Sequence, residues 1–151
     1  MVVPLPTYVP MELLSKRQRE ETHEPFARYL IELSGATAAL WVRWNTVYRA
    51  LGLDCWTIER DANLYDGPGP IIAHPPCGPW GKYAHVSKES KSHGIRAMEL
   101  VHRFGGVVEQ PRGSTLFKEY GSSGQVLRVM QHDYGHPALK PTDLYIVNLG
   151  E

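Results

Sequence analysis

Short apolar runs separated by glycine, proline and charged residues set the pattern of this chain. Such runs, rich in β-branched and aromatic side chains, are typical of strands. The predicted strands cover residues 54–58, 71–73, 107–108, 125–131 and 144–149. A Gly-Pro-Gly-Pro sequence precedes the second strand and a proline pair ends it, because proline cannot donate a ladder hydrogen bond.

Two helices are predicted from apolar residues that recur every three or four positions. One covers residues 37–51, where the recurring side chains are Trp41, Trp44, Tyr48 and Leu51. We expect these aromatic side chains in the core. The other helix covers residues 92–104 and ends at Gly105. Strands that alternate with helices in this way indicate an α/β fold.

The first third of the chain is less uniform. Residues 1–10 carry three prolines and predict an extended arm, and residues 11–20 predict a short surface helix with a thin apolar face. The next segment has two interpretations. A helix can begin near Thr22 and end at Gly35, or a strand over 29–33 can lead into a turn at Ser34-Gly35.

Length and composition narrow the class of protein. A chain of 151 residues fits one domain. The two cysteines, Cys55 and Cys77, are too few for a disulfide framework, and their spacing shows no metal-binding pattern, so a cytoplasmic setting is expected. We expect no membrane association, because no apolar run approaches bilayer length. The net charge of zero disfavours tight, non-specific binding to duplex DNA.

The strand at 71–73 delivers a cysteine into a loop stiffened by proline. Its sequence continues as His74-Pro75-Pro76-Cys77, and the following helix leads to a second strand that ends at Glu109. A right-handed strand-helix-strand unit brings the ends of both strands to the same edge of the sheet. Cys77 and Glu109 are therefore expected to be neighbours at the edge where α/β sheets bind ligands.

A cysteine and a carboxylic acid placed in this way suit covalent addition to an electron-poor ring. The thiolate attacks carbon while the acid protonates a ring nitrogen. This chemistry needs positive charge near Cys77, from Lys82, Arg112 or His74, and a Glu109 that burial keeps protonated. Two structural alternatives stay open: Cys77 is a small buried hydrophobe, or Glu109 caps a turn or pairs with Arg112.

Three motifs in order resemble DNA cytosine-C5 methyltransferases, especially the compact versions carried by bacteriophages. They are His74-Pro75-Pro76-Cys77, Glu109-Gln110-Pro111, and Asp133-Tyr134-Gly135-His136-Pro137 before the last strand. The resemblance implies that Cys77 adds to C6 of a flipped cytosine and that Glu109 engages N3 and the exocyclic amine. The substrate-binding residues that it implies are His74, Pro76, Lys82, Gln110, Arg112, Lys140 and Thr142.

The resemblance also implies a cofactor, S-adenosylmethionine, and a Rossmann-like methyltransferase sheet. In this interpretation residues 1–24 form an arm and short helix, and residues 25–151 form one minimal catalytic domain. The strand alternative for 29–33 then leads into a glycine turn, and the implied cofactor-binding residues are Ser34, Gly35, Glu59 and Asp61. The chain departs from the family pattern in having a single glycine in that turn, and in Gly78 and Gln110 after the nucleophile and the acid.

The sequence thus predicts a DNA (cytosine-5) methyltransferase-like enzyme. Its substrate is DNA or a nucleotide, and because no separate target-recognition domain is expected, a protein partner would supply DNA recognition. If the protein is encoded by a phage, the host cytoplasm is its expected location. Two alternatives remain: a degenerate methyltransferase scaffold that binds a host factor or defence protein, and a pyrimidine modifier that uses another one-carbon donor or a free nucleotide.

Overall fold

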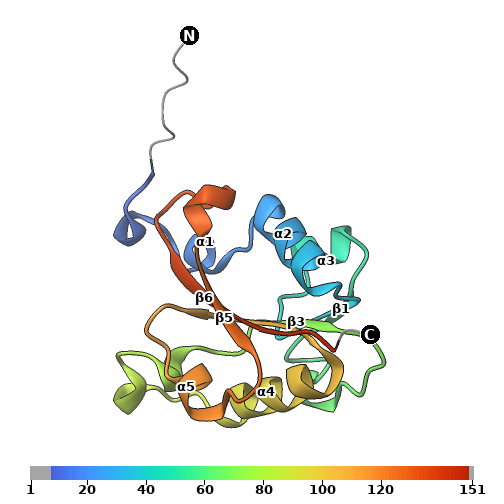
Figure 1. Ribbon diagram of the computed structural model, residues 1–151. Coiled ribbons are helices and arrows are strands. Elements are labelled where there is room, and N and C mark those ends of the chain that lie inside the picture. Colours follow the sequence, from blue (N-terminus) through green and yellow to red (C-terminus); the bar gives the residue numbers. More distant parts are fainter. Residues whose placement is uncertain (1–7, 150–151) are drawn as a thin grey trace.

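The computed structural model describes residues 8–149 and contains one mixed six-stranded sheet in the order β2-β1-β3-β4-β6-β5 (Figure 1). The strands are β1 Ala38–Leu40, β2 Asp54–Trp56, β3 Ile71–Ala73, β4 Gly106–Pro111, β5 Gln125–Met130 and β6 Pro141–Val147. Strands β1 to β4 run parallel, and β6 is antiparallel to both of its neighbours. The α/β fold class predicted from the sequence is confirmed.

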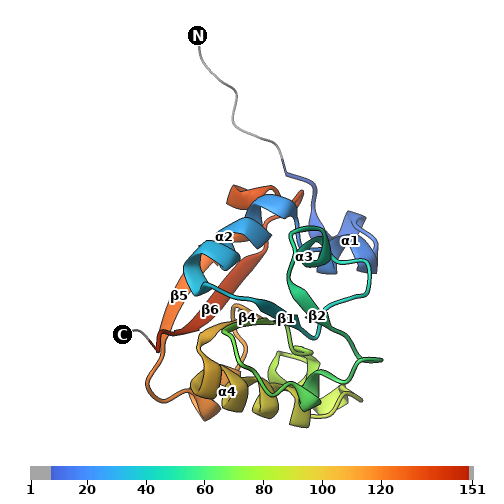
Figure 2. The ribbon, with the colours of Figure 1, turned by 90° about the vertical axis from the view of Figure 1, so that its right-hand side faces the viewer.

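Helices cover both faces of this sheet (Figures 1 and 2). Helices α1 Lys16–Glu20, α2 Glu24–Ser34 and α3 Val47–Ala50 lie on one side, and α4 Ser92–Phe104 and α5 Leu116–Tyr120 lie on the other. Short 3₁₀ turns complete the chain: η1 Met11–Leu13, η2 Ala62–Leu64, η3 Gly78–Trp80, η4 Ala84–Val86 and η5 Gln131–Tyr134. None of the described helices is long and apolar enough to cross a membrane.

The core consists of two apolar layers, because successive side chains of a strand point to opposite faces of the sheet. Ile72, Val107 and Leu144 pack with the α2 side chains, which include Phe26 and Leu30. Alternate residues of the same strands, which include Ala73 and Val108, pack on the other face with the α4 side chains, which include Met98 and Leu100. This alternation decides which side chains beyond the strand ends can meet.

The helix predicted over 37–51 is wrong. Residues 38–40 form strand β1, which pairs with β2 on one side and β3 on the other, and only 47–50 are α-helical. Trp41 has a φ of 58°, which a right-handed helix cannot contain. Trp44, expected in the core, is 64% exposed and lies under the guanidinium of Arg49. The helical spacing was coincidental because fully buried short strands carry no alternation.

For residues 22–35 the helical alternative is correct and the strand over 29–33 is wrong. Helix α2 has Pro25 in its first turn and ends at Gly35, whose φ of 64° is the left-handed conformation that glycine adopts without a Cβ clash. In the preceding segment, η1 and α1 replace the single surface helix predicted over 11–20. The arm predicted over 1–10 is described only from Tyr8 onward, where the amide of Val9 donates to the carbonyl of Pro137.

The strand-helix-strand unit around Cys77 follows the sequence closely. Helix α4 has the predicted bounds, and β3 and β4 are adjacent and parallel, with Ala73 opposite Val108. The chain runs outward from β1 to β2, then crosses back to β3 and continues to β4 on the other side. The order of the strands thus reverses between β1 and β3, and doubly wound sheets bind ligands at the carboxyl edge beside such a reversal.

Candidate active site at the carboxyl edge of the sheet

Cys77 lies at the carboxyl edge of the sheet, in the loop between β3 and the η3 turn. It is a free, exposed cysteine, so the alternative that it is a buried hydrophobe is wrong; Cys55 is the buried one. Gly78 follows it where a Cβ would come within 2.6 Å of side-chain oxygens of Ser87 and Glu89. A Cβ at this position would require the side chains of Ser87 and Glu89 to move.

His74 and Glu109 are paired across the ends of β3 and β4. They lie one position beyond the last registered pair of these strands, and His74 Nδ1 is 2.9 Å from Glu109 Oε2. Both side chains are largely buried, 15% and 11% exposed. Glu109 therefore pairs with His74 and not with Arg112, which instead lies 3.8 Å from Asp143.

Tyr48, from α3, extends this pair on the other side of the imidazole. Its hydroxyl lies 2.8 Å from His74 Nε2. Burial raises the pKa of Tyr48 well above its ordinary value, and the charge of Glu109 raises it further, so the phenol keeps its proton. We assign the His74 Nδ1–H as donor to the Glu109 carboxylate, with the Tyr48 hydroxyl hydrogen-bonded to the other ring nitrogen.

The charge state of Glu109 differs from the sequence expectation. Burial raises the pKa of this carboxyl, but the hydrogen bond and charge of His74, with a contribution from Lys140, more than offset burial. The net pKa lies below the ordinary glutamate value, so Glu109 is an anion at neutral pH. The expectation that burial keeps it protonated is wrong, because the sequence did not reveal its imidazole partner.

The thiol of Cys77 shows the opposite behaviour. Burial raises its pKa, and the carboxylates of Glu109 and Glu89 raise it further. Lys140 lowers the pKa only in part. Neither Lys82, which lies 5.7 Å from the Tyr83 ring centre, nor Arg112 supplies the positive field that the sequence suggested. In the free protein Cys77 is thus a thiol at neutral pH.

Gln110 fixes the proline loop from the opposite face of the sheet. Its Nε2 donates to the carbonyl of Pro75 at 2.9 Å, and its Oε1 accepts from the Ser114 hydroxyl at 2.9 Å. Pro76 is half-buried between this anchored residue and Cys77. Gln110 therefore has a structural role in holding the loop.

Lys140 immediately precedes β6 and Thr142 lies within it, and both are near Glu109. Gln131 connects them, because its Nε2 donates to Thr142 Oγ1 at 2.9 Å and lies 3.5 Å from Glu109 Oε1. The Lys140 ammonium donates to the carbonyl of Arg19 at 3.0 Å. The sequence did not identify Gln131 or Tyr48 as site residues. For Gln131 the one available signal was its position just before the Asp-Tyr-Gly-His-Pro motif.

The residues implied for the cofactor do not come together. Ser34 and Gly35 precede β1 and lie at the amino edge of the sheet, whereas Cys77 lies at the carboxyl edge. Ser34 Oγ donates to the Leu30 carbonyl and accepts from the Ala36 amide, so it serves the end of α2. Glu59 and Asp61 follow β2 and do lie at the carboxyl edge.

The turn that follows β1 at the carboxyl edge has no glycine. Trp41 occupies it in a left-handed conformation, with its ring buried and its Nε1 donating to His93 Nδ1 at 3.1 Å. Asp61 accepts hydrogen bonds from the backbone and side-chain nitrogens of Asn63, which lower its pKa, and Glu59 is exposed. The turn at which doubly wound sheets carry glycine for the close approach of a nucleotide thus holds a buried tryptophan in this protein.

Comparison of the chain with models of known protein families, with curated proteins and with solved structures finds no match.

Proposed function

We propose that this chain is a cytosine-C5-methyltransferase-like enzyme in which Cys77 adds covalently to C6 of a cytosine in DNA. The observation that carries the proposal is the placement of an exposed cysteine and a buried, oriented carboxylate at the ends of adjacent parallel strands. Covalent addition to a pyrimidine needs a nucleophile and a proton-handling group held on one rigid edge.

The chain's own residues supply the nucleophilic half of the reaction. The Glu109 carboxylate accepts a hydrogen bond from the exocyclic amine of the base, and base entry removes water from it and raises its pKa, which favours a shared proton at N3. His74 and Tyr48 hold the carboxylate in place. Glu109 takes this proton from solvent as the base enters. Cys77 releases its own proton to solvent and forms the S–C6 bond, while the electron pair of the C5=C6 double bond moves toward N3, where the proton shared with Glu109 stabilises it.

The strand order supports the finer fold assignment, a Rossmann-like methyltransferase sheet. The reversal between β1 and β3 places Cys77 beside the crevice used by nucleotide-binding sheets. S-adenosylmethionine, the donor that the resemblance implies, has weaker support, since Ser34 and Gly35 lie at the opposite edge. A variant of this proposal uses a different one-carbon donor or a free nucleotide as substrate. For action on DNA, we propose that a protein partner supplies the recognition and that the reaction takes place in the cytoplasm.

A second candidate is a catalytically degenerate scaffold that binds a host factor or defence protein. The buried Trp41 ring in the turn after β1 and the raised pKa of Cys77 favour it.

Exchange of the cytosine C5 hydrogen with solvent separates these functions without presuming a donor. Addition of Cys77 to C6 makes C5 basic, so cytosine deuterated at C5 should lose its label when an oligonucleotide is incubated with the protein. Mass spectrometry of the recovered nucleosides measures this loss. Cys77→Ser should abolish it, while Cys55→Ser, a matched change at the buried cysteine, should leave it intact. Retention of the label with the unaltered protein on single-stranded and duplex DNA would favour the binding protein.

The donor is tested separately by calorimetry. If S-adenosylmethionine is the donor, it should release heat on binding, and Asp61→Ala should weaken that binding while Glu32→Ala, at the other edge, should not. Label exchange without any such heat would point to another one-carbon donor.

A further inference from the structure

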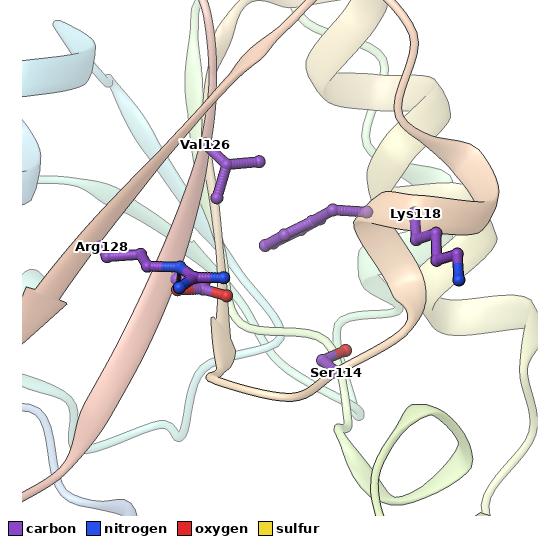
Figure 3. A pocket seen from close by; sticks show the side chains of 6 residues that line it. Ser114, Lys118, Val126 and Arg128 are labelled. Carbon is purple, nitrogen blue, oxygen red and sulfur yellow. Dashed lines mark ion pairs between the residues drawn. The ribbon is translucent and has the colours of Figure 1, made fainter.

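A pocket lies on the face of the sheet that α4 and α5 cover, between α5 and the hairpin of β5 and β6. It is an open pocket with a volume of about 400 Å³, and it is lined by Ser114, Phe117, Lys118, Val126, Arg128 and Asp143 (Figure 3). The side chains of Val126 and Arg128 project from the hairpin, and Ser114 lies in the loop that leads into α5.

This pocket is separate from the His74–Glu109 pair. Arg128 is registered opposite Asp143 and Val126 opposite Tyr145, and Tyr145 packs on the face covered by α4. Glu109 is registered opposite Leu144, which packs on the α2 face. Since adjacent residues of a strand point to opposite faces, the pocket and the carboxylate of Glu109 lie on different sides of the sheet.

The pocket combines three kinds of side chain. Phe117 and Val126 give apolar walls, and Arg128, 70% exposed, gives a cation that can turn toward an anion. The third element is Asp143. Its Oδ1 is buried beneath the guanidinium groups of Arg128 and Arg112, whose Nε atoms lie 3.6 Å and 3.8 Å away, and it accepts no hydrogen bond from the residues that the structure describes. This oxygen is thus ion-paired without being hydrogen-bonded, and a donor brought by a ligand would complete it.

We propose that this pocket binds a nucleotide whose base carries an exocyclic amino group. The base lies against Phe117 and Val126. The exposed Arg128 turns from Asp143 to donate to the phosphate, and the amine of the base takes its place as donor to the Asp143 carboxylate. Aromatic side chains take bases by stacking, and guanidinium groups match phosphate oxygens. Thymine and uracil offer a carbonyl where cytosine and adenine offer the amine, so the Asp143 carboxylate discriminates against them.

Two hydrogen-bond connections join the pocket to the loop that carries Cys77. The Ser114 hydroxyl donates to Gln110, which in turn holds the carbonyl of Pro75. The amide of the next residue, Thr115, donates to the Trp80 carbonyl at 2.9 Å. On the proposed function, on which this step alone rests, the pocket holds a nucleotide near the one presented to Cys77, and its occupancy steadies that loop.

Nuclear magnetic resonance titration of the full chain tests the pocket directly, with dCMP, dAMP, dTMP and inorganic phosphate as probes. We expect dCMP and dAMP to shift the backbone amides of α5 and β5 and to bind about tenfold more tightly than dTMP, the value of one charge-assisted hydrogen bond. Arg128→Gln should weaken all three nucleotides. Asp143→Asn should remove the preference for dCMP over dTMP.

The matched control is Arg103→Gln, which removes an exposed arginine of α4 paired with Asp66 at 3.2 Å and should change no affinity. A short oligonucleotide shows whether the natural ligand is a DNA strand or a free nucleotide. Tighter binding of d(CCCC) than of dCMP indicates a strand, and equal binding indicates a free nucleotide. Either result supports a nucleotide site in this pocket. Equal affinities for dCMP and dTMP, or shifts confined to residues around His74, would overturn the inference. Nucleotide binding here without C5 hydrogen exchange would leave the pocket in place and remove the proposed reaction.

Discussion

Replacing Glu109 by glutamine tests the charge state on which the candidate site depends. The structure makes Glu109 an anion that accepts a 2.9 Å hydrogen bond from His74 in a nearly buried setting. Hydrogen bonds to charged groups contribute about 1.5–3 kcal/mol and neutral ones about 1 kcal/mol. We therefore expect Glu109→Gln to lower the free energy of unfolding by about 1–2 kcal/mol at pH 7.

The pH dependence of this loss has a defined sign. Because the folded-state pKa of Glu109 lies below its unfolded value of about 4.3, its contribution is fully present above that value. It is lost as the pH falls through the folded-state pKa, where the wild-type carboxyl also becomes neutral. The difference between wild type and Glu109→Gln should therefore be present at pH 7 and shrink below about pH 4.

Urea unfolding followed by tryptophan fluorescence measures both quantities. Glu99→Gln is the matched control, since Glu99 is 59% exposed and pairs with Arg96 on the surface of α4, where such pairs contribute little. If burial instead kept Glu109 protonated, glutamine would be neutral or stabilising at pH 7. A Glu109→Gln variant as stable as wild type at pH 7 would thus refute the assignment of an anion and with it the Tyr48–His74–Glu109 arrangement.

Two further predictions concern the loop that carries Cys77. The rate of Cys77 alkylation by iodoacetamide should rise with pH through a midpoint above about 8.5, because desolvation of the sulfur and the charge of Glu109 raise the thiol pKa. Intact-protein mass spectrometry measures the rate, with Cys77→Ser as the blank. A midpoint below about 7.5 would contradict the raised pKa. Gly94→Ala should lower the free energy of unfolding in urea by about 1–3 kcal/mol, because the new Cβ would lie 2.5 Å from Trp80 Nε1. This loss should exceed the gain that alanine brings to a helix. A gain in stability would show that the Trp80 ring moves away freely.

The unit from β3 to β4 was predictable because its signals are local. A short apolar run, a proline pair, a helix with one apolar side and a glycine stop occur in sequence, and each has one structural meaning. Parallel pairing of the two strands then brings Cys77 and Glu109 to one edge. The segment after Gly35 was not predictable in this way, because three buried residues in β1 show no alternation and the tryptophans beyond them imitate helical spacing.

The amino-acid sequence by itself determined the α/β class, the exposed loop with Cys77, and Glu109 as its neighbour. The tertiary structure decided the chemistry of that neighbour. A carboxyl at a strand end can be a neutral acid or an anion, and the choice depends on whether a partner offsets its desolvation. His74 does so only because the register of β3 and β4 places it opposite Glu109, with Tyr48 arriving from α3. The register of β5 and β6 likewise places Arg128 beside Asp143 on the opposite face, a pairing that no local sequence pattern reveals.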